Sequence, residues 1–251
     1  MYCNFILLIF ILFINFINSY IFNIGSTGLL LPYSLGILGY IKKYNIINSD
    51  ELIGTSGGSY CSLLYKFENN LNSHDFIWNN IFNLNKSTKI DLYNLNKFQL
   101  RNNNILFNRY LNNSVNNLNI KIVATQYNNI LDKKKCIFSY YSNISDLINK
   151  CYCSSYIPYI SGDKFYYKYN NTKYYDGAFN KINKKNIHYS FNNNNLIINK
   201  LSQNNNIFYI NSNTWGRKWN EPFKHYLDYE TSEFLFYQGW YDTLHNIDKI
   251  L

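Results

Sequence analysis

The stretch ELIGTSGGSYCSLLY, residues 51–65, joins a short apolar run to a glycine-rich corner and then to a segment with helical spacing. Ser56 stands there among Gly54, Gly57 and Gly58 in the pattern G-x-S-x-G. A sharp turn from strand to helix needs small residues around the serine, whose hydroxyl then projects above a sheet at a helix N-terminus. The same pattern also fits a serine without a catalytic role in a glycine turn. The flanking elements therefore have to distinguish a nucleophile from a turn residue.

The elements before this corner predict a βαβ unit. Residues 20–25, YIFNIG, are typical of a short buried strand, and a helical pattern follows from Pro32, which suits the first turn of a helix. Gly36 and Gly39 weaken that helix and predict its close approach to a sheet. Because the strand at 51–55 comes next, the first 60 residues predict a parallel sheet.

The rest of the chain adds further expected elements. Residues 68–117 are rich in asparagine and show helical fragments that cannot be ordered from the sequence, and Lys133-Lys134-Lys135 is expected in a solvated loop. Elsewhere the patterns predict a strand at 119–127 with a partner CIFSYY (136–141), a helix from a Ser145-Asp146 cap to near Pro158, a hairpin with its turn at Asn170-Asn171, short strands LIIN and IFYIN, and a helix from Thr231 to Leu251.

Composition and charge bound the class of protein. A chain of 251 residues with 47% hydrophobic residues fits one sizeable domain, which we assign to residues 20–251. The net charge of +9 comes from lysines scattered among asparagines, so it does not indicate nucleic-acid binding. Residues 5–17 form an apolar block followed by Asn18-Ser19, which predicts that residues 1–19 are a signal peptide or a hydrophobic N-terminal anchor.

The cysteines and histidines indicate no metal site. Cys61, Cys136, Cys151 and Cys153 show no regular disulfide framework, and Cys151-Tyr152-Cys153 lacks a second ligand pair at the spacing that zinc needs. We therefore expect these cysteines to pack in the interior, and we expect no metal and no cofactor.

A serine hydroxyl becomes a nucleophile only when a base removes its proton and donors stabilise the oxyanion. The loop Gly25-Ser26-Thr27-Gly28 follows the first strand. In a parallel sheet this loop would face Ser56 with its backbone N–H groups, as an oxyanion hole does. The candidate bases are four histidines and one aspartate at a strand end: His74, His188, His225, His245 and Asp176.

At this point the sequence resembles the patatin-like phospholipase family. The blocks that carry the resemblance are NIGSTGLLLPYSLGIL, IGTSGG, KIVATQY, CYCSSYIPYISG and KYYDGAFN, in this order over residues 20–180, and FLFYQGWYDTL is similar to the family's closing helix. The resemblance implies a three-layer α/β/α fold with a mainly parallel central sheet. It also implies a Ser56–Asp176 dyad without histidine, in which Asp176, Gly177 and Ala178 form the Asp-Gly motif.

The glycine loop departs from the family pattern. Ser26 and Thr27 interrupt the glycines, and Leu29-Leu30-Leu31 stands where the family often has a basic residue. A backbone donor needs no particular side chain, so an oxyanion hole remains compatible with this loop.

Together with the serine corner, the resemblance implies a lipid acyl hydrolase that cleaves acyl esters of glycerolipids, either phospholipid or triacylglycerol, at a membrane or droplet surface. The apolar block at 5–17 predicts that the protein is in the secretory pathway or associated with a membrane. Two alternatives stay open. One is a catalytically silent lipid-binding protein on the same scaffold, and the other is an α/β-hydrolase with a Ser-Asp-His triad completed by His225 or His245. The sequence indicates no oligomeric state.

Overall fold

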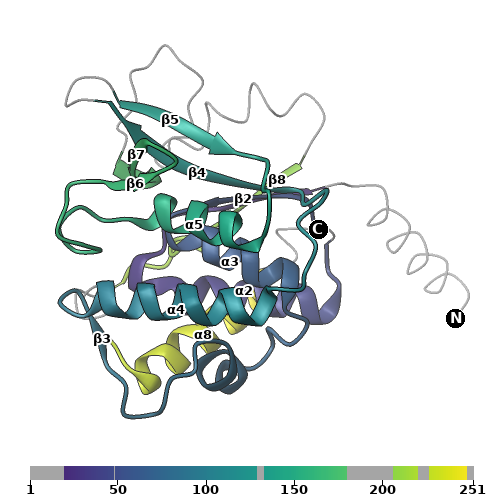
Figure 1. The fold of residues 1–251 in the computed structure, drawn as a ribbon. Helices are drawn as coiled ribbons and strands as arrows, with labels where there is room; N and C mark the ends of the chain where they lie inside the picture. Colours follow the sequence, from purple (N-terminus) through teal and green to yellow (C-terminus); the bar gives the residue numbers. More distant parts are fainter. Residues whose placement is uncertain (1–19, 48, 129–132, 180–205, 220–225, 248–251) are drawn as a thin grey trace, which may run out of the picture.

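A central sheet organises the computed structural model, which describes residues 20–47, 49–128, 133–179, 206–219 and 226–247 (Figure 1). Its strand order is β6-β7-β4-β2-β1-β8, with β5 also paired to β4. The central strands are parallel: β1 (Tyr20–Ile24), β2 (Ser49–Thr55), β4 (Ile120–Tyr127) and β8 (Asn206–Ile210). Three further strands pair antiparallel at one side: β5 (Lys133–Phe138), β6 (Tyr167–Tyr169) and β7 (Thr172–Asp176).

Helices flank this sheet. Helices α3 (Gly57–Phe67) and α5 (Ile144–Ser155) pack directly on its strands, and α2 (Leu31–Tyr44), α4 (Leu95–Tyr110) and α8 (Tyr229–Asn246) pack around them (Figure 1). This mixed α/β architecture with a mostly parallel central sheet confirms the predicted fold class, and it is consistent with a three-layer α/β/α fold. The remaining described elements are short: η1 (Gly28–Leu30), η2 (Phe76–Ile81), η3 (Gly177–Phe179), and the two-stranded sheet of β3 (Ile90–Asp91) and β9 (Tyr226–Leu227).

Alternation along the strands places apolar side chains on both faces of the sheet. Phe22 of β1, Leu52 of β2 and Ile122 of β4 are buried in the main core with the helices. Their neighbours Ile21 and Ile53, together with Val123, form a smaller cluster apart from that core. Both faces of these strands therefore carry buried apolar side chains, as is usual for a parallel sheet.

Helices α2 and α8 contact each other at glycines. A Cβ atom added to Gly36 of α2 would lie 1.9 Å from the Phe236 carbonyl oxygen of α8, and one added to Gly239 of α8 would lie 2.1 Å from the Tyr33 oxygen of α2. The prediction that the α2 glycines approach a sheet is therefore wrong. The two helix backbones touch each other instead, and Gly39 approaches Leu71.

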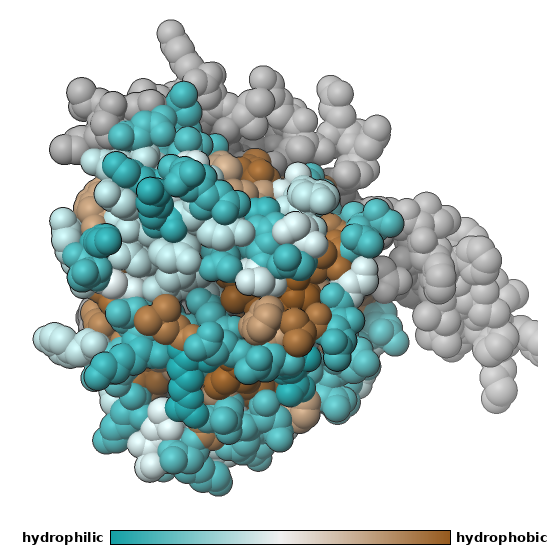
Figure 2. Space-filling model, viewed as in Figure 1, coloured by the Kyte–Doolittle hydropathy of each residue, from teal (hydrophilic) through white to brown (hydrophobic). Residues whose placement is uncertain are grey.

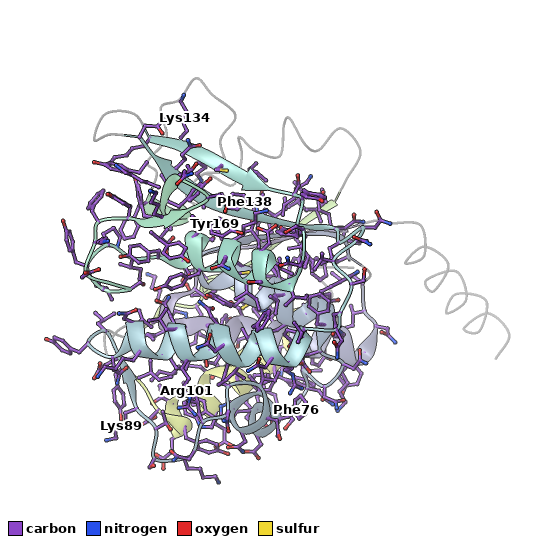
Figure 3. The ribbon with its side chains drawn as sticks, viewed as in Figure 1. Phe76, Lys89, Arg101, Lys134, Phe138 and Tyr169 are labelled. Carbon is purple, nitrogen blue, oxygen red and sulfur yellow. The ribbon has the colours of Figure 1, made fainter. Side chains whose placement is uncertain are left out.

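Helix α4 lies across the lower half of the molecule and is held near its middle and at its C-terminal end. Arg101 reaches from it to the Asn83 carbonyl oxygen at 2.5 Å (Figure 3), and the Arg109 guanidinium pairs with the buried carboxylate of Glu68. In Figure 2 the described surface on this side is largely hydrophilic, with hydrophobic residues showing in a band across its middle. Helix α4 covers a large part of the Asn-rich segment 68–117, whose elements the sequence patterns do not assign.

Several element boundaries differ from the predictions. Lys133-Lys134-Lys135 lies in β5 and not in a loop, because Lys133–Phe138 pairs with β4 while Lys133 and Lys134 stay exposed. The helix predicted to begin at Ser145-Asp146 is capped earlier by Asn143, whose side chain accepts a hydrogen bond from the Asp146 N–H. The hairpin turn at Asn170-Asn171 and the strand IFYIN are confirmed, whereas the predicted strand LIIN lies outside the described residues.

The N-terminal segment 1–19 also lies outside the described residues, so the signal-peptide prediction stays a prediction. Within the described ranges, no helix combines the length and hydrophobicity needed to cross a membrane.

Candidate active site

Ser56 occupies a strained corner between β2 and α3. Its backbone angles are φ 56° and ψ −129°, a combination that residues with side chains rarely adopt and that structures retain mainly at functional sites. The neighbouring chain is too close for anything but glycine: a Cβ atom on Gly54 would lie 2.6 Å from Ser59 Cα, and one on Gly58 would lie 2.2 Å from the Ile24 oxygen. The sequence folds sharply here because these glycines allow it to.

Sheet register brings Ser56 to Asp176. Strand β2 pairs with β4 so that Thr55 lies opposite Val123, and β4 pairs with β7 so that Ala124 lies opposite Asp176. The ends of β2 and β7 thus flank the same point of β4. There the Ser56 hydroxyl donates a hydrogen bond to Asp176 Oδ2 at 2.5 Å, although the two residues are 120 positions apart in the chain.

The Asp176 carboxylate is held in one orientation. Its second oxygen, Oδ1, accepts the Ala178 N–H at 2.7 Å. Its backbone N–H donates to the Tyr156 oxygen at 2.8 Å, and its carbonyl accepts the Thr125 hydroxyl at 3.1 Å. The Asp-Gly motif therefore ends a strand and opens the short helix η3, and no hairpin turn occurs there.

Burial makes the Asp176 carboxylate a stronger base than an exposed aspartate. Only 2% of the residue is exposed, and desolvation raises the pKa of its carboxyl group from 3.8 to about 6, against the lowering effect of the hydrogen bonds from Ser56 and Ala178. At neutral pH the group is ionised and still able to accept a proton. A pKa near the working pH is what general-base catalysis requires.

Helix α5 supports the corner from the side. The Ser56 N–H donates to Ser154 Oγ at 2.8 Å, and the Ser154 hydroxyl in turn donates to the Val123 oxygen of β4 at 2.6 Å. Both serines are buried. The Ser154 hydroxyl therefore ties the Ser56 backbone to the central strand that also carries β7.

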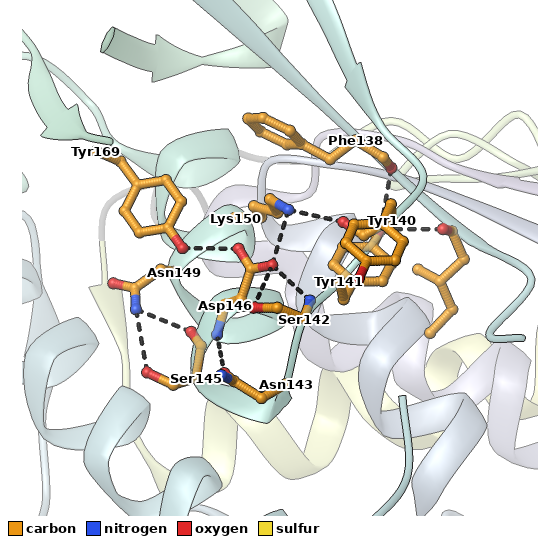
Figure 4. Close-up of polar contacts among 11 residues, drawn as sticks. Phe138, Tyr140, Tyr141, Ser142, Asn143, Ser145, Asp146, Asn149, Lys150 and Tyr169 are labelled. Carbon is orange, nitrogen blue, oxygen red and sulfur yellow. Dashed lines mark hydrogen bonds and ion pairs between the residues drawn. The ribbon is translucent and has the colours of Figure 1, made fainter. Parts of the chain in front are cut away.

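The start of α5 is fixed by a polar network around Asp146 (Figure 4). Its carboxylate accepts the Ser142 N–H at 2.8 Å, the Lys150 ammonium at 3.0 Å and the Tyr169 hydroxyl at 2.7 Å. These bonds join α5 to the loop before it and to β6, and they explain why the pKa of Asp146 is lowered although partial burial opposes the charge. Phe138 lies over the same side of α5 in Figures 3 and 4. The network sets the position from which Ser154 reaches Ser56.

The loop after β1 lies against the corner, as the sequence predicted. A Cβ atom on Gly57 would lie 2.3 Å from Thr27 Oγ1 and 3.5 Å from the Gly28 backbone nitrogen, so the two loops are in contact. Gly28 has φ +52°, which favours glycine. The Gly25 N–H donates to the Ile210 oxygen of β8 at 2.8 Å, so it is occupied in the sheet. Ser26 is partly exposed beside it.

An apolar cavity of about 250 Å³ opens beside Ser56. Gly28 and Gly57 border it with the serine, which places the candidate donors and the candidate nucleophile on one wall. Most of the remaining wall is aliphatic or aromatic and comes from α2, η2, α4 and α8. Its members include Leu29, Leu31, Leu35, Tyr60, Ile77, Trp78, Phe82, Leu84, Leu95, Phe98, Leu106, Leu227 and Phe236.

The described histidines do not contact the dyad. His74 is buried with its Nε2 at 2.9 Å from Ser232 Oγ, and the exposed His245 lies with Nδ1 at 2.7 Å from the Tyr241 oxygen. His188 and His225, which the sequence also raised as bases, lie outside the described residues.

Sequence reasoning missed three contributors to the site. The sequence predicts no role for Ser154 and no cavity residues. It also does not include the Gly57 N–H among the oxyanion donors, although Gly57 directly follows the nucleophile. The signal available for Ser154 was a pair of small polar residues at the buried end of an otherwise apolar helix face. The cavity residues had no such signal, because they come from distant elements that only the fold brings together.

The four cysteines that the structure describes are free thiols: Cys61, Cys151 and Cys153 are buried, as predicted, whereas Cys136 is only half-buried. Burial raises the pKa of the Cys151 thiol to about 12, so it is a thiol at neutral pH. Among the described residues, no group of three or more His, Cys, Asp or Glu side chains is placed to hold a metal ion.

Neither a scan against protein-family models nor a search of curated proteins finds a match to this chain.

Proposed function

We propose that this protein is a serine hydrolase that cleaves acyl esters of glycerolipids, with Ser56 as the nucleophile and Asp176 as the general base. The observation that carries this proposal is the 2.5 Å hydrogen bond from Ser56 Oγ to the buried Asp176 carboxylate, with Ser56 on the wall of an apolar cavity. A strained serine at a helix N-terminus, a base in contact with it and an adjoining cavity are the parts that acyl transfer needs.

The reaction runs in two halves. In the first, Ser56 Oγ attacks the ester carbonyl carbon while its proton passes to Asp176. The oxyanion forms beside the Gly28 and Gly57 N–H groups, with the Ser26 and Thr27 N–H groups as further candidate donors. The carbon–oxygen bond to the alcohol then breaks and Asp176 returns the proton to the leaving oxygen, which produces an acyl-Ser56 and a free alcohol.

In the second half a water molecule gives a proton to Asp176 and attacks the acyl carbonyl carbon. The bond to Ser56 Oγ breaks, the fatty acid leaves, and Asp176 returns the proton to Ser56. No metal or cofactor takes part in this scheme. The apolar walls of the cavity suit the acyl chain, because burying each methylene group is worth about 0.8 kcal/mol.

Two exposed aromatic side chains support a substrate presented at a membrane or droplet surface: Phe179, three residues after Asp176, and Tyr159, whose ring lies 6.1 Å from that of Phe165. Phe179 is 53% exposed and Tyr159 is 70% exposed. Side chains of this kind bind at the boundary between lipid and water. A location in the secretory pathway stays a proposal that rests on residues 5–17.

A silent lipid-binding scaffold is the second candidate. The observation in its favour is that the Gly25 N–H is occupied by Ile210, which removes one of the four donors first assigned to the loop. Against a Ser-Asp-His triad, Asp176 contacts Ser56 directly, and the histidines within the described ranges have other partners.

A fluorophosphonate probe tests the proposal, since it labels an activated serine and leaves a tetrahedral phosphorus where the oxyanion forms. We expect labelling of the wild type at Ser56, none in Ser56→Ala and little in Asp176→Asn. A folded triple variant with His188, His225 and His245 replaced by Gln should keep its labelling. Loss in the His variant with survival in Asp176→Asn would indicate a triad, and a folded wild type that is never labelled would indicate the silent scaffold.

A further inference from the structure

The cavity beside Ser56 contains polar atoms that its apolar walls do not satisfy. Within the part of the chain that the structure describes, three residues that line the cavity have a buried side-chain atom without a hydrogen-bond partner: Asn102 Oδ1, Gln99 Oε1 and His74 Nδ1. Asn102 is 6% exposed and His74 is 1% exposed. A buried polar atom without a partner destabilises the fold, so three of them on residues around one cavity require an explanation.

Two of these atoms come from one face of α4 near the nucleophile. Gln99 and Asn102 are three residues apart, which places them on the same side of the helix. The Gln99 amide nitrogen donates to the Ser155 oxygen at 3.3 Å, and Ser155 follows the residue that accepts the Ser56 N–H. The neighbouring Asn103 accepts the hydroxyl of Tyr60, one turn after Ser56, at 2.8 Å.

The third atom belongs to the wall formed by η2 and α8. His74 packs among Trp78, Tyr229 and Phe236, and among the described residues it has a hydrogen-bond partner only for Nε2, namely Ser232. Desolvation lowers the pKa of its ring to about 4, so the ring is neutral at neutral pH. In a neutral ring Nδ1 is a donor or an acceptor according to the tautomer.

A hydroxyl group matches one of the two amide oxygens together with His74 Nδ1, because it donates one hydrogen bond and accepts others. The amide oxygens accept hydrogen bonds, His74 Nδ1 does either, and a hydroxyl both donates and accepts. A carboxylate or phosphate on the acyl chain would place a negative charge beside two acceptors in a buried site, which is unfavourable. The aliphatic remainder of the wall requires that this hydroxyl be carried on a hydrocarbon chain.

We propose that the cavity selects an acyl chain that bears a hydroxyl group, and that Asn102 is the residue that binds it. This inference rests on the proposed hydrolase function and names the substrate class of the same site. A few placed polar groups in a largely apolar pocket set orientation and specificity, because a plain chain leaves those groups buried and unpaired.

The test compares p-nitrophenyl decanoate with a set of p-nitrophenyl hydroxydecanoates that differ in the position of the hydroxyl. For the wild type we expect at least one hydroxy ester to exceed the plain ester in kcat/KM by about tenfold or more. In Asn102→Leu, which keeps the side-chain volume and removes the acceptor, this ratio should fall toward one. Asn104→Leu makes the same change at an exposed position of α4 and should keep the wild-type ratio.

A binding measurement separates failure of this inference from failure of the hydrolase proposal. Hydroxydecanoate should raise the Tm of the Ser56→Ala variant more than decanoate does, and Asn102→Leu in that background should remove the difference. Hydrolysis or binding with no preference for any hydroxy chain, or a preference that Asn102→Leu leaves intact, overturns the inference, and water then accounts for the polar atoms. Hydroxy-selective binding without any hydrolysis overturns the enzyme proposal alone.

Discussion

At the scale of single residues, Asp176 links the chemistry to pH. Its carboxyl group has to be ionised to take the Ser56 proton, and burial raises its pKa to about 6. We therefore expect kcat/KM for ester hydrolysis to fall as pH drops through about 6 and to level off above it. A pH–rate profile with a short-chain ester measures this. A profile that is flat from pH 5 to 8 would contradict the assignment of Asp176 as base.

The same residue should make the fold less stable at neutral pH. Because the folded pKa is raised from 3.8 to about 6, its favourable contribution is fully present below pH 4 and is lost as pH rises through 6. The Asp176→Asn variant, which cannot ionise, should gain up to roughly 3 kcal/mol in free energy of unfolding over the wild type at pH 8, and little at pH 4. Urea denaturation at the two pH values checks the sign. Equal differences at both would show that Asp176 does not titrate with folding.

At the scale of elements, the strand–corner–helix unit depends on glycines that touch backbone. A methyl group at Gly58 would lie 2.2 Å from the Ile24 oxygen and 2.4 Å from the Gly25 oxygen, and neither carbonyl can move without disturbing β1. Gly58→Ala should cost about 3 kcal/mol or more in stability. Gly216→Ala is the control, since no atom of the described residues lies within 4 Å of the added Cβ and its φ of +74° is unfavourable by about 1 kcal/mol. Thermal denaturation should rank the two, and similar losses would contradict the close packing.

Elements with strong local signals could be predicted from the sequence. The βαβ unit before Ser56 and the Asn170-Asn171 hairpin combine apolar runs with turn residues, so local spacing is enough to predict both elements. The packing of Gly36 against α8 could not be predicted, because the sequence shows that a glycine is needed but not which distant backbone requires it. The cavity was missed because asparagine-rich residues 68–117 carry weak periodicity and its walls come from separate elements. The family resemblance implies Ser56 and Asp176 as the dyad. It does not reveal that Ser154 binds the Ser56 N–H, because that contact depends on how α5 packs against the corner.

At the scale of the whole molecule, the size of the cavity should set the acyl length that is accepted in the proposed hydrolase reaction. Leu106 is fully buried and lines the cavity, so Leu106→Phe extends a ring into space that a long chain would occupy. We expect kcat/KM for a long-chain ester to fall by about tenfold while that for an acetyl ester changes little. Leu100→Phe on the exposed side of α4 serves as control. An equal loss with both esters would show distortion of the site.

The parallel pairing of β1 with both β2 and β8 also has a consequence for synthesis. Ser56 leaves the ribosome 120 residues before Asp176 does, which at about 5–20 residues per second is an interval on the order of ten seconds. Strand β8 and helix α8, which border β1 and α2, emerge later still. If the chain is the hydrolase proposed above, its nascent form carries Ser56 without Asp176 and without a closed cavity, so hydrolysis is expected only when translation is almost complete.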